Sequence, residues 1–264
     1  MAAADLSART RGGELRQRVW VGAGAAVVAI GALAVGSYAL WLLVVAGAIV
    51  AVAEWGALVG AERSRLGLGL VVLALALVAV APPVWGTDRS TVALLLILSL
   101  LAMLAPRTAA TAWGVAYVGL GAIALLFLRG QPHGFALALW ALLVVWATDI
   151  GAFFAGRRIG GPKLAPRISP NKTWAGLAGG VLAAAVVGGA WAAVTHLPAM
   201  AFWLAPVLAI VAQAGDLLES GMKRRAGVKD SGALLPGHGG VLDRIDGVLP
   251  VLILTAALVA NGNF

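Results

Sequence analysis

The sequence predicts an all-helical protein that crosses a membrane several times. Of its 264 residues, 61% are hydrophobic and 11% are charged, whereas soluble domains are about 45–50% apolar. Its mean hydropathy is +0.97. The apolar residues form long runs separated by short polar gaps, which is the pattern of consecutive membrane-spanning helices.

The composition also limits the chemistry and the domain organisation. The chain contains no cysteine, which excludes disulfides, zinc-thiolate sites and iron-sulfur clusters, so a catalytic metal would be held by oxygen or imidazole ligands. No linker-like composition separates the apolar runs. We therefore expect a basic cytoplasmic tail at 1–18 and a single membrane domain at 19–264.

Nine apolar segments are candidates for transmembrane helices, for which about 20 residues are needed. The segment after the basic tail has no small-residue cleavage site followed by a soluble domain, so we expect it to be retained as the first span. The approximate bounds are 19–36, 38–60, 66–82, 91–105, 112–128, 134–155, 173–197, 200–218 and 247–262.

The basic residues predict the orientation of these nine spans. With a cytoplasmic N-terminus, 17 of the 19 Lys and Arg residues fall on the cytoplasmic side, and only Arg89 and Arg129 fall outside. Cytoplasmic loops of membrane proteins carry this excess of positive charge. The net charge of +8 is thereby explained without nucleic acid, for which no binding motif is present.

The first of two charged segments lies at about 146–174. Asp149 falls late in an apolar helix, where a carboxylate is costly unless it is paired or reaches water, so it is a candidate functional residue. An ion pair with Arg157 or Arg158 would be a purely structural alternative. The following loop is rich in glycine and cations, which suits phosphate oxygens or anionic lipid headgroups. Ser169 or Thr173 could instead cap the next helix.

The second charged segment lies at about 213–247. If the eighth helix continues to about residue 224, four polar side chains share one of its faces; they are Asp216, Glu219, Ser220 and Lys223. After a glycine-rich break, Asp243 and Asp246 stand three residues apart at the start of the ninth helix, where the helix dipole favours anions.

Carboxylates and cations gathered at two helix ends suit phosphoryl or nucleotidyl transfer, in which metal ions neutralise a polyphosphate. Oxygen ligands favour Mg2+ or Mn2+, and a second cation is possible. The alternative is a structural ion-pair network that holds two helix ends together. His238 could donate to a phosphate or be only a turn residue. Glu54, inside the second span, could pair with Arg129 or line a cavity, so we leave it outside the catalytic set.

One long motif resembles the signature of the phosphatidate cytidylyltransferase (CDP-diacylglycerol synthase) family. It runs from Ser220-Gly221-Met222-Lys223-Arg224, through Lys229-Asp230-Ser231-Gly232, to Leu235-Pro236-Gly237-His238-Gly239-Gly240-Val241-Leu242-Asp243-Arg244-Ile245-Asp246. Upstream stretches at 149–154 and 169–174 also resemble the family, and the likeness extends over most of the chain. Phe153 and Gly247 depart from the expected tyrosine and serine.

This resemblance implies transfer of a cytidylyl group from CTP to phosphatidic acid, giving CDP-diacylglycerol and pyrophosphate for phospholipid synthesis. It implies a catalytic set of Asp216, Lys223, Asp243 and Asp246, with Asp216 and Asp246 as the ligands of Mg2+ or Mn2+. It implies substrate binding by Asp149, Ser169, Asn171, Lys172, Ser220, Arg224, Lys229, Asp230, His238, Gly239, Gly240 and Arg244.

The resemblance further implies a homodimer in the bilayer, of a bacterial inner-membrane type, with its active site facing the cytoplasm. A CTP-dependent polyprenol or diacylglycerol kinase is the main alternative function. A transporter is a third, although its charges would be expected near the middle of the membrane in two similar halves.

Overall fold

The computed structural model describes residues 22–82, 95–99, 109–234 and 239–262, which are almost entirely helical. Five of the described helices are long and apolar enough to cross a membrane, which supports a helical membrane protein. They are α2 (Ser37–Leu58), α5 (Ala109–Arg129), α6 (Gly134–Ile159), α7 (Trp174–Val194) and α8 (Met200–Arg225).

Three further described helices coincide with predicted spans but are shorter than the five helices above. They are Gly22–Val35, α3 (Arg63–Ala79) and α10 (Val248–Ala260), which follows the single turn α9 (Leu242–Ile245). Residues 95–99 are a helical part of the fourth predicted span, and the rest of that span lies outside the described residues. The count of nine spans therefore stays a prediction.

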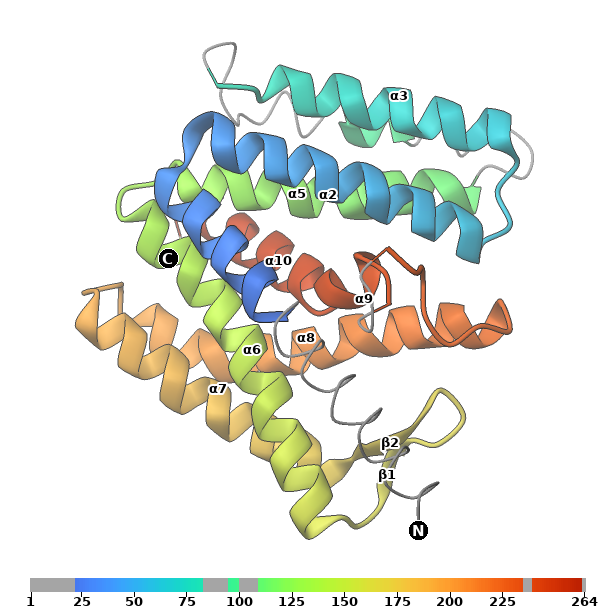
Figure 1. The fold of residues 1–264 in the computed structure, drawn as a ribbon. Helices are drawn as coiled ribbons and strands as arrows, with labels where there is room; N and C mark the ends of the chain where they lie inside the picture. The colour runs from blue at the N-terminus through green and yellow to red at the C-terminus, as the bar shows by residue number, and fades with distance from the viewer. Residues whose placement is uncertain (1–21, 83–94, 100–108, 235–238, 263–264) are drawn as a thin grey trace, which may run out of the picture.

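The helices pack in layers around two apolar cores (Figure 1). α3 lies on one side and packs on α2 and α5, while α6 and α7 lie on the other side with α8 and α10 between. Indole hydrogen bonds join neighbouring helices. Trp41 Nε1 donates to Leu77 O at 2.8 Å, and Trp140 Nε1 donates to Gly188 O at 3.1 Å.

The direction of the helices brings several of their ends to one side of the bundle. In Figure 1, α2 and α8 end on the right, where α3, α5 and α10 begin. This alternation agrees with consecutive crossings in opposite directions. It gathers the polar residues at 54, 216–225 and 239–246 into one region although they are far apart in the chain.

α6 and α7 approach closely because glycines face the neighbouring backbone. A Cβ added to Gly176 would lie 3.1 Å from Ala152 O, and one added to Gly180 would lie 2.8 Å from Thr148 O. The G-x-x-x-G spacing of these two glycines is typical of close helix packing in membranes. Here that packing lies within the chain.

The expectation of an all-helical chain is wrong for one short segment. β1 (Lys163–Ala165) and β2 (Ser169–Thr173) form an antiparallel hairpin in which Lys163 pairs with Thr173 and Ala165 with Ser169. Thr173 then caps α7, since its Oγ1 accepts a hydrogen bond from Gly176 N at 3.0 Å. Of the two cap candidates, Thr173 is the one that forms the cap.

The start of the ninth span also differs from expectation. Asp243 lies in the first turn of α9, but Asp246 falls in the link before α10 rather than in one continuous helix. α8 approaches this link so closely that a Cβ on Gly215 would collide with Asp246 O. The close approach places Asp216 of α8 next to the link.

We expect Gly180→Val to destabilise the bundle by about 1–3 kcal/mol, the usual cost of overpacking. The added side chain would strike Thr148 O of α6. Thermal unfolding in detergent would measure the loss. Gly67→Val is the matched control, because a Cβ at Gly67 of α3 meets nothing within 4 Å. Equal shifts in both variants would contradict the packing role of Gly180.

Candidate active site

A buried lysine joins α8 to α9. Lys223 Nζ lies 2.9 Å from Glu219 Oε2, one turn back on α8, and 2.6 Å from Asp243 Oδ1 on α9. The exposed fractions of these side chains are only 12%, 4% and 6%. Since an unpaired charge at such a depth is strongly unfavourable, the three groups hold one another in place.

The other oxygen of Asp243 organises the glycine-rich loop before α9. Oδ2 accepts hydrogen bonds from Ser231 N at 2.9 Å, Ser231 Oγ at 3.0 Å and Gly240 N at 2.8 Å. Burial raises the pKa of Asp243, but the hydrogen bonds from Lys223, Gly240 and Ser231 outweigh it and lower the pKa to about 2. Asp243 is therefore an anion that acts as a structural centre of the loop.

Glu54 of α2 closes the same loop from the opposite side. Its Oε1 accepts from Val241 N at 3.0 Å, and its Oε2 accepts from Leu242 N at 2.7 Å and from Ser231 Oγ at 3.2 Å. A Cβ at Gly232 or Gly240 would collide with the Glu54 carboxylate. Both glycines therefore provide the space for this contact.

The proposed pairing of Glu54 with Arg129 is wrong. Arg129 instead donates to two backbone carbonyls at the end of helix Gly22–Val35, to Leu33 O at 2.7 Å and to Ala34 O at 3.2 Å. Glu54 lies near the C-terminal end of α2 and Arg129 at the C-terminal end of α5. Because α2 ends on the side where α5 begins (Figure 1), the two residues lie at opposite ends of the bundle. Arg129 therefore binds the end of the first helix, and Glu54 binds the loop before α9.

A second polar cluster links the hairpin, α8 and α6. Lys172 Nζ of β2 lies 2.6 Å from Asp216 Oδ2 and 2.8 Å from Gln213 Oε1. Ser220 Oγ donates to Asp216 Oδ1 at 3.1 Å, and Gln213 Nε2 donates to Asp149 Oδ1 at 3.5 Å. Asp149 is exposed and Asp216 is 31% exposed, so this cluster is open to ligands.

Within the described residues, Asp149 takes part in this cluster rather than in an ion pair with Arg157 or Arg158. Arg157 instead lies over the Phe153 ring, with 6.0 Å from its guanidinium carbon to the ring centroid. The structural alternative for Asp149 is therefore not formed.

Asp246 connects this second polar cluster with the first, which Lys223, Glu219 and Asp243 form. Its Oδ1 accepts a hydrogen bond from Gly247 N at 2.7 Å. Burial and the charge of Asp216 raise the pKa of Asp246 to about 6, so the two carboxylates are close enough to repel each other. Among the described residues, nothing donates a hydrogen bond to the buried Glu219 Oε1 nearby.

Acidic side chains outnumber basic ones in this region. Its acids are Asp149, Asp216, Glu219, Asp243 and Asp246, and its bases are Lys172, Lys223 and Arg244. A bound cation would reduce the repulsion among these acids. Within the described residues, however, no group of three or more His, Asp or Glu side chains is arranged to hold a metal ion alone.

The donor set nevertheless fits Mg2+, which commonly takes one or two carboxylates from the protein and its other ligands from substrate phosphates and water. Asp216 and Asp246 are two such carboxylates from different elements. Lys172 and Lys223 lie beside them and could contact phosphate oxygens. Two carboxylates with two lysines beside them are suited to binding a polyphosphate together with a metal ion.

The remaining predicted site residues are more peripheral. Arg224 holds the hairpin turn and the α8 end, because its Nε donates to Ile168 O at 3.3 Å and its Nη1 donates to Val228 O at 3.4 Å. Gly239 lies against Asp243 Oδ2. Ser169 is half-buried, and His238 lies outside the described residues. Among these remaining residues, Asn171, Arg224, Lys229, Asp230 and Arg244 are exposed.

Four contributors to the clusters were missing from the predicted site: Glu54, Gln213, Glu219 and Ser231. For Glu54 and Gln213 the available signal was a polar residue inside an apolar helix, which requires a partner. Ser231 lies inside the long motif, but a serine in a glycine-rich stretch does not disclose which carboxylate it contacts.

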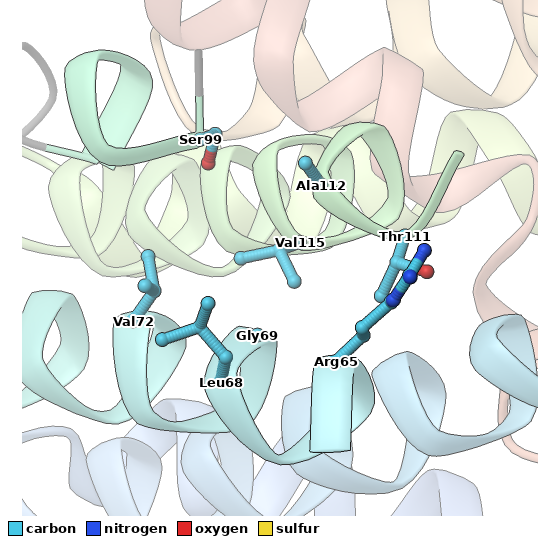
Figure 2. A pocket seen from close by; sticks show the side chains of 8 residues that line it. All are labelled: Arg65, Leu68, Gly69, Val72, Ser99, Thr111, Ala112 and Val115. Atoms are coloured by element: carbon cyan, nitrogen blue, oxygen red, sulfur yellow. The ribbon is translucent and has the colours of Figure 1, made fainter. Parts of the chain in front are cut away.

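Two pockets differ sharply in character. The first lies between α3 and α5 and has a volume of about 20 Å3, room for about one water molecule. Figure 2 shows its lining, in which Arg65, Ser99 and Thr111 are the polar members among small and aliphatic residues. The second pocket, of about 530 Å3, extends to Arg244 beside the two polar clusters. Only the second has the size of a ligand site.

Comparison with known sequences gives a family match over nearly the whole chain. The sequence model described as "Cytidylyltransferase family" matches residues 16–261. That range includes every residue of the two polar clusters.

Several curated relatives are named phosphatidate cytidylyltransferase. The one from Brucella suis biovar 1 is 55% identical over 151 residues, covering 55% of this chain and 54% of the relative. The one from Staphylococcus epidermidis is 46% identical over 149 residues, covering 55% and 56%. The one from Bacillus subtilis is 44% identical over 134 residues, covering 48% and 50%. The chain thus spans about half the length of the curated relatives it matches.

We expect Glu54→Gln to loosen the loop before α9, because one carboxylate oxygen is replaced by an amide nitrogen that cannot accept a hydrogen bond. Hydrogen exchange at Val241 and Leu242 should accelerate by roughly tenfold or more, since a hydrogen bond to a charged group is worth about 1.5–3 kcal/mol. Glu62→Gln is the control, as Glu62 is 59% exposed and pairs only locally with Arg65. Unchanged exchange in Glu54→Gln would contradict the clamp.

Proposed function

The chain belongs to the cytidylyltransferase family, and on this premise we propose that it is a phosphatidate cytidylyltransferase. It would transfer a cytidylyl group from CTP to phosphatidic acid and release pyrophosphate. The observation that carries the proposal is the pair of joined polar clusters. Lys172 pairs with Asp216, Lys223 pairs with Glu219 and Asp243, and Asp246 lies close to both Asp216 and Lys223.

The reaction needs no nucleophilic side chain. An oxygen of the phosphatidate phosphate attacks the α-phosphorus of CTP, and the bond from that phosphorus to the oxygen of the β-phosphate breaks, so that pyrophosphate leaves with the electron pair. A phosphate monoester has a second pKa near 6 and is largely a dianion at neutral pH. A general base is therefore unnecessary, and the protein acts through orientation and electrostatics.

The residues of the two clusters would divide the work. A Mg2+ ion held by Asp216 and Asp246 would supply charge neutralisation at the triphosphate. Lys223, fixed by Glu219 and Asp243, would stabilise charge on the phosphates, and Lys172 would do so from the hairpin. The other predicted substrate contacts would complete the nucleotide and headgroup pocket around this centre.

We also propose the finer topology on the basis of the charge distribution. The chain would span a bacterial-type inner membrane nine times, with its N-terminus and active site on the cytoplasmic side, where CTP is available. A homodimer remains part of the proposal. The alternation of helix directions in Figure 1 is compatible with this topology.

We expect the purified protein with CTP, Mg2+ and phosphatidic acid to form a CMP-bearing lipid and pyrophosphate in equal amounts. Mass spectrometry of the lipid and a pyrophosphate assay would measure both products. Release of CDP with a phosphorylated alcohol from diacylglycerol or a polyprenol would instead identify a CTP-dependent kinase. Substrate movement into vesicles without CTP turnover would identify a transporter.

We expect Asp246→Asn and Asp216→Asn to lower kcat by about 100-fold or more, as loss of one electrostatic contact in a phosphoryl-transfer site commonly does. Both variants should also need more Mg2+ for half-maximal activity, which a purely structural change would not cause. Glu62→Gln is the control. An unchanged Mg2+ dependence with normal turnover would remove the altered aspartate from the ligand set.

A further inference from the structure

The end of α6 and the hairpin that follows it carry a group of exposed cations. Between Asp149 and Asp216 the sequence contains five Lys and Arg residues and no acidic residue. Within the described residues, Lys172 is the one of these five that forms an ion pair, with Asp216. The other four are exposed, and we call them the basic surface; they are Arg157, Arg158, Lys163 and Arg167.

The hairpin separates Lys163 from Lys172. Lys172 of β2 lies 2.6 Å from Asp216 Oδ2, in the second polar cluster. Lys163 of β1 pairs with Thr173, the residue next to Lys172. Paired residues share a face of a sheet, and successive residues of a strand point to opposite faces. Lys163 and Lys172 therefore lie on opposite faces of the hairpin, and the basic surface is distinct from the site that Lys172 joins.

Exposed aromatic side chains border the basic surface. Phe153 and Phe154 of α6 are more than half exposed, and they precede Arg157 and Arg158 by one helical turn. Trp174, the first residue of α7, is also more than half exposed. Aromatic residues followed by cations are typical of the level at which a helix leaves the hydrocarbon of a membrane. The basic surface would thus lie at the depth of the lipid headgroups.

We propose that the basic surface binds the headgroups of anionic phospholipids in the surrounding leaflet. Four cations without an acidic neighbour in the sequence complement a layer of phosphates, and the aromatic border would contact the acyl chains. The lipid is here a binding partner and not a reactant. The inference therefore holds whether or not the chain transfers a cytidylyl group.

Binding at this surface would hold the hairpin from its outer face. Lys172 holds the inner face by its contacts with Asp216 and with Gln213 Oε1, at 2.6 Å and 2.8 Å. Headgroups on Lys163 and Arg167 would limit the movement of the same two strands. The charge of the leaflet would in this way affect how firmly Lys172 is positioned, although no bound lipid would enter the polar clusters.

The first test removes two charges from the hairpin. Lys163→Gln combined with Arg167→Gln should weaken the binding of dioleoyl phosphatidylglycerol by about 30-fold, since each cation near an anionic surface contributes about fivefold. Native mass spectrometry of the full chain in a neutral detergent, without nucleotide, would measure the affinity. The unaltered protein should bind dioleoyl phosphatidylcholine more weakly, and the double variant should lose most of this preference. Added salt should weaken the phosphatidylglycerol complex.

Control variants separate the effect of charge from that of structure. Lys163→Arg combined with Arg167→Lys keeps both charges and should keep the affinity for phosphatidylglycerol. Arg63→Gln removes one exposed cation from α3 and should change that affinity much less than Arg167→Gln does. Thermal unfolding should be alike in the two hairpin double variants, because both altered side chains are exposed.

Three results would overturn the inference. Equal binding of phosphatidylglycerol and phosphatidylcholine by the unaltered protein would exclude recognition of the anionic headgroup. An unchanged lipid preference in the Gln double variant would exclude the basic surface as its origin. Weaker binding of CTP in that variant, with unchanged lipid affinity, would identify a nucleotide surface instead. Because these measurements use no turnover, their failure would leave the proposed reaction intact, and an inactive protein could still confirm the lipid contact.

Discussion

The contact of Lys223 with Glu219 and Asp243 is the constraint on which the rest of the site depends. It places one cation between two almost fully buried carboxylates, at 2.9 Å and 2.6 Å. Removal of Lys223 would leave two carboxyl groups without their cation in an apolar bundle, which is far costlier than loss of a surface pair. α8 and α9 are therefore fixed relative to each other, and with them the positions of Asp216 and Asp246. Glu54 extends the constraint to α2 by accepting the backbone amides at 241 and 242.

The same region combines groups that stabilise the fold with groups that repel each other. Asp243 is fully satisfied by Lys223 and by three donors of the loop, which holds its pKa near 2. Asp246 has the opposite environment, since burial and Asp216 raise its pKa to about 6. Two aspartates three residues apart thus differ because one faces donors and the other faces acids. Environments that separate the pKa values of neighbouring carboxyl groups are typical of functional sites. This contrast supports a positioning role for Asp243 and a cation-binding role for Asp246 within the proposed function.

Most helix positions were predictable because each depends on a local run of apolar residues. The predicted segment 134–155 corresponds to α6 at Gly134–Ile159, and 112–128 corresponds to α5 at Ala109–Arg129. The hairpin at 163–173 was missed because its strands are three and five residues long and contain charges and proline without alternation. The partner of Glu54 was missed for a different reason. A buried carboxylate requires donors, but Ser231 is 177 positions away, and backbone amides leave no mark in the sequence. Sequence could therefore name most of the cluster but not its internal contacts.

The single turn α9 directs neighbouring residues of one short motif toward different parts of the structure. Residues three apart lie on the same side of a helical turn, whereas the residue after the first of them is rotated by about 100°. Asp243 accordingly contacts Lys223 of α8, while Arg244, the next residue, lines the apolar pocket. Asp246, in the link before α10, lies close to Asp216 of α8. The link also packs against Gly215 of α8, where a Cβ would collide with Asp246 O. The turn and the link together therefore direct Asp243 and Asp246 toward α8 and Arg244 toward the apolar pocket.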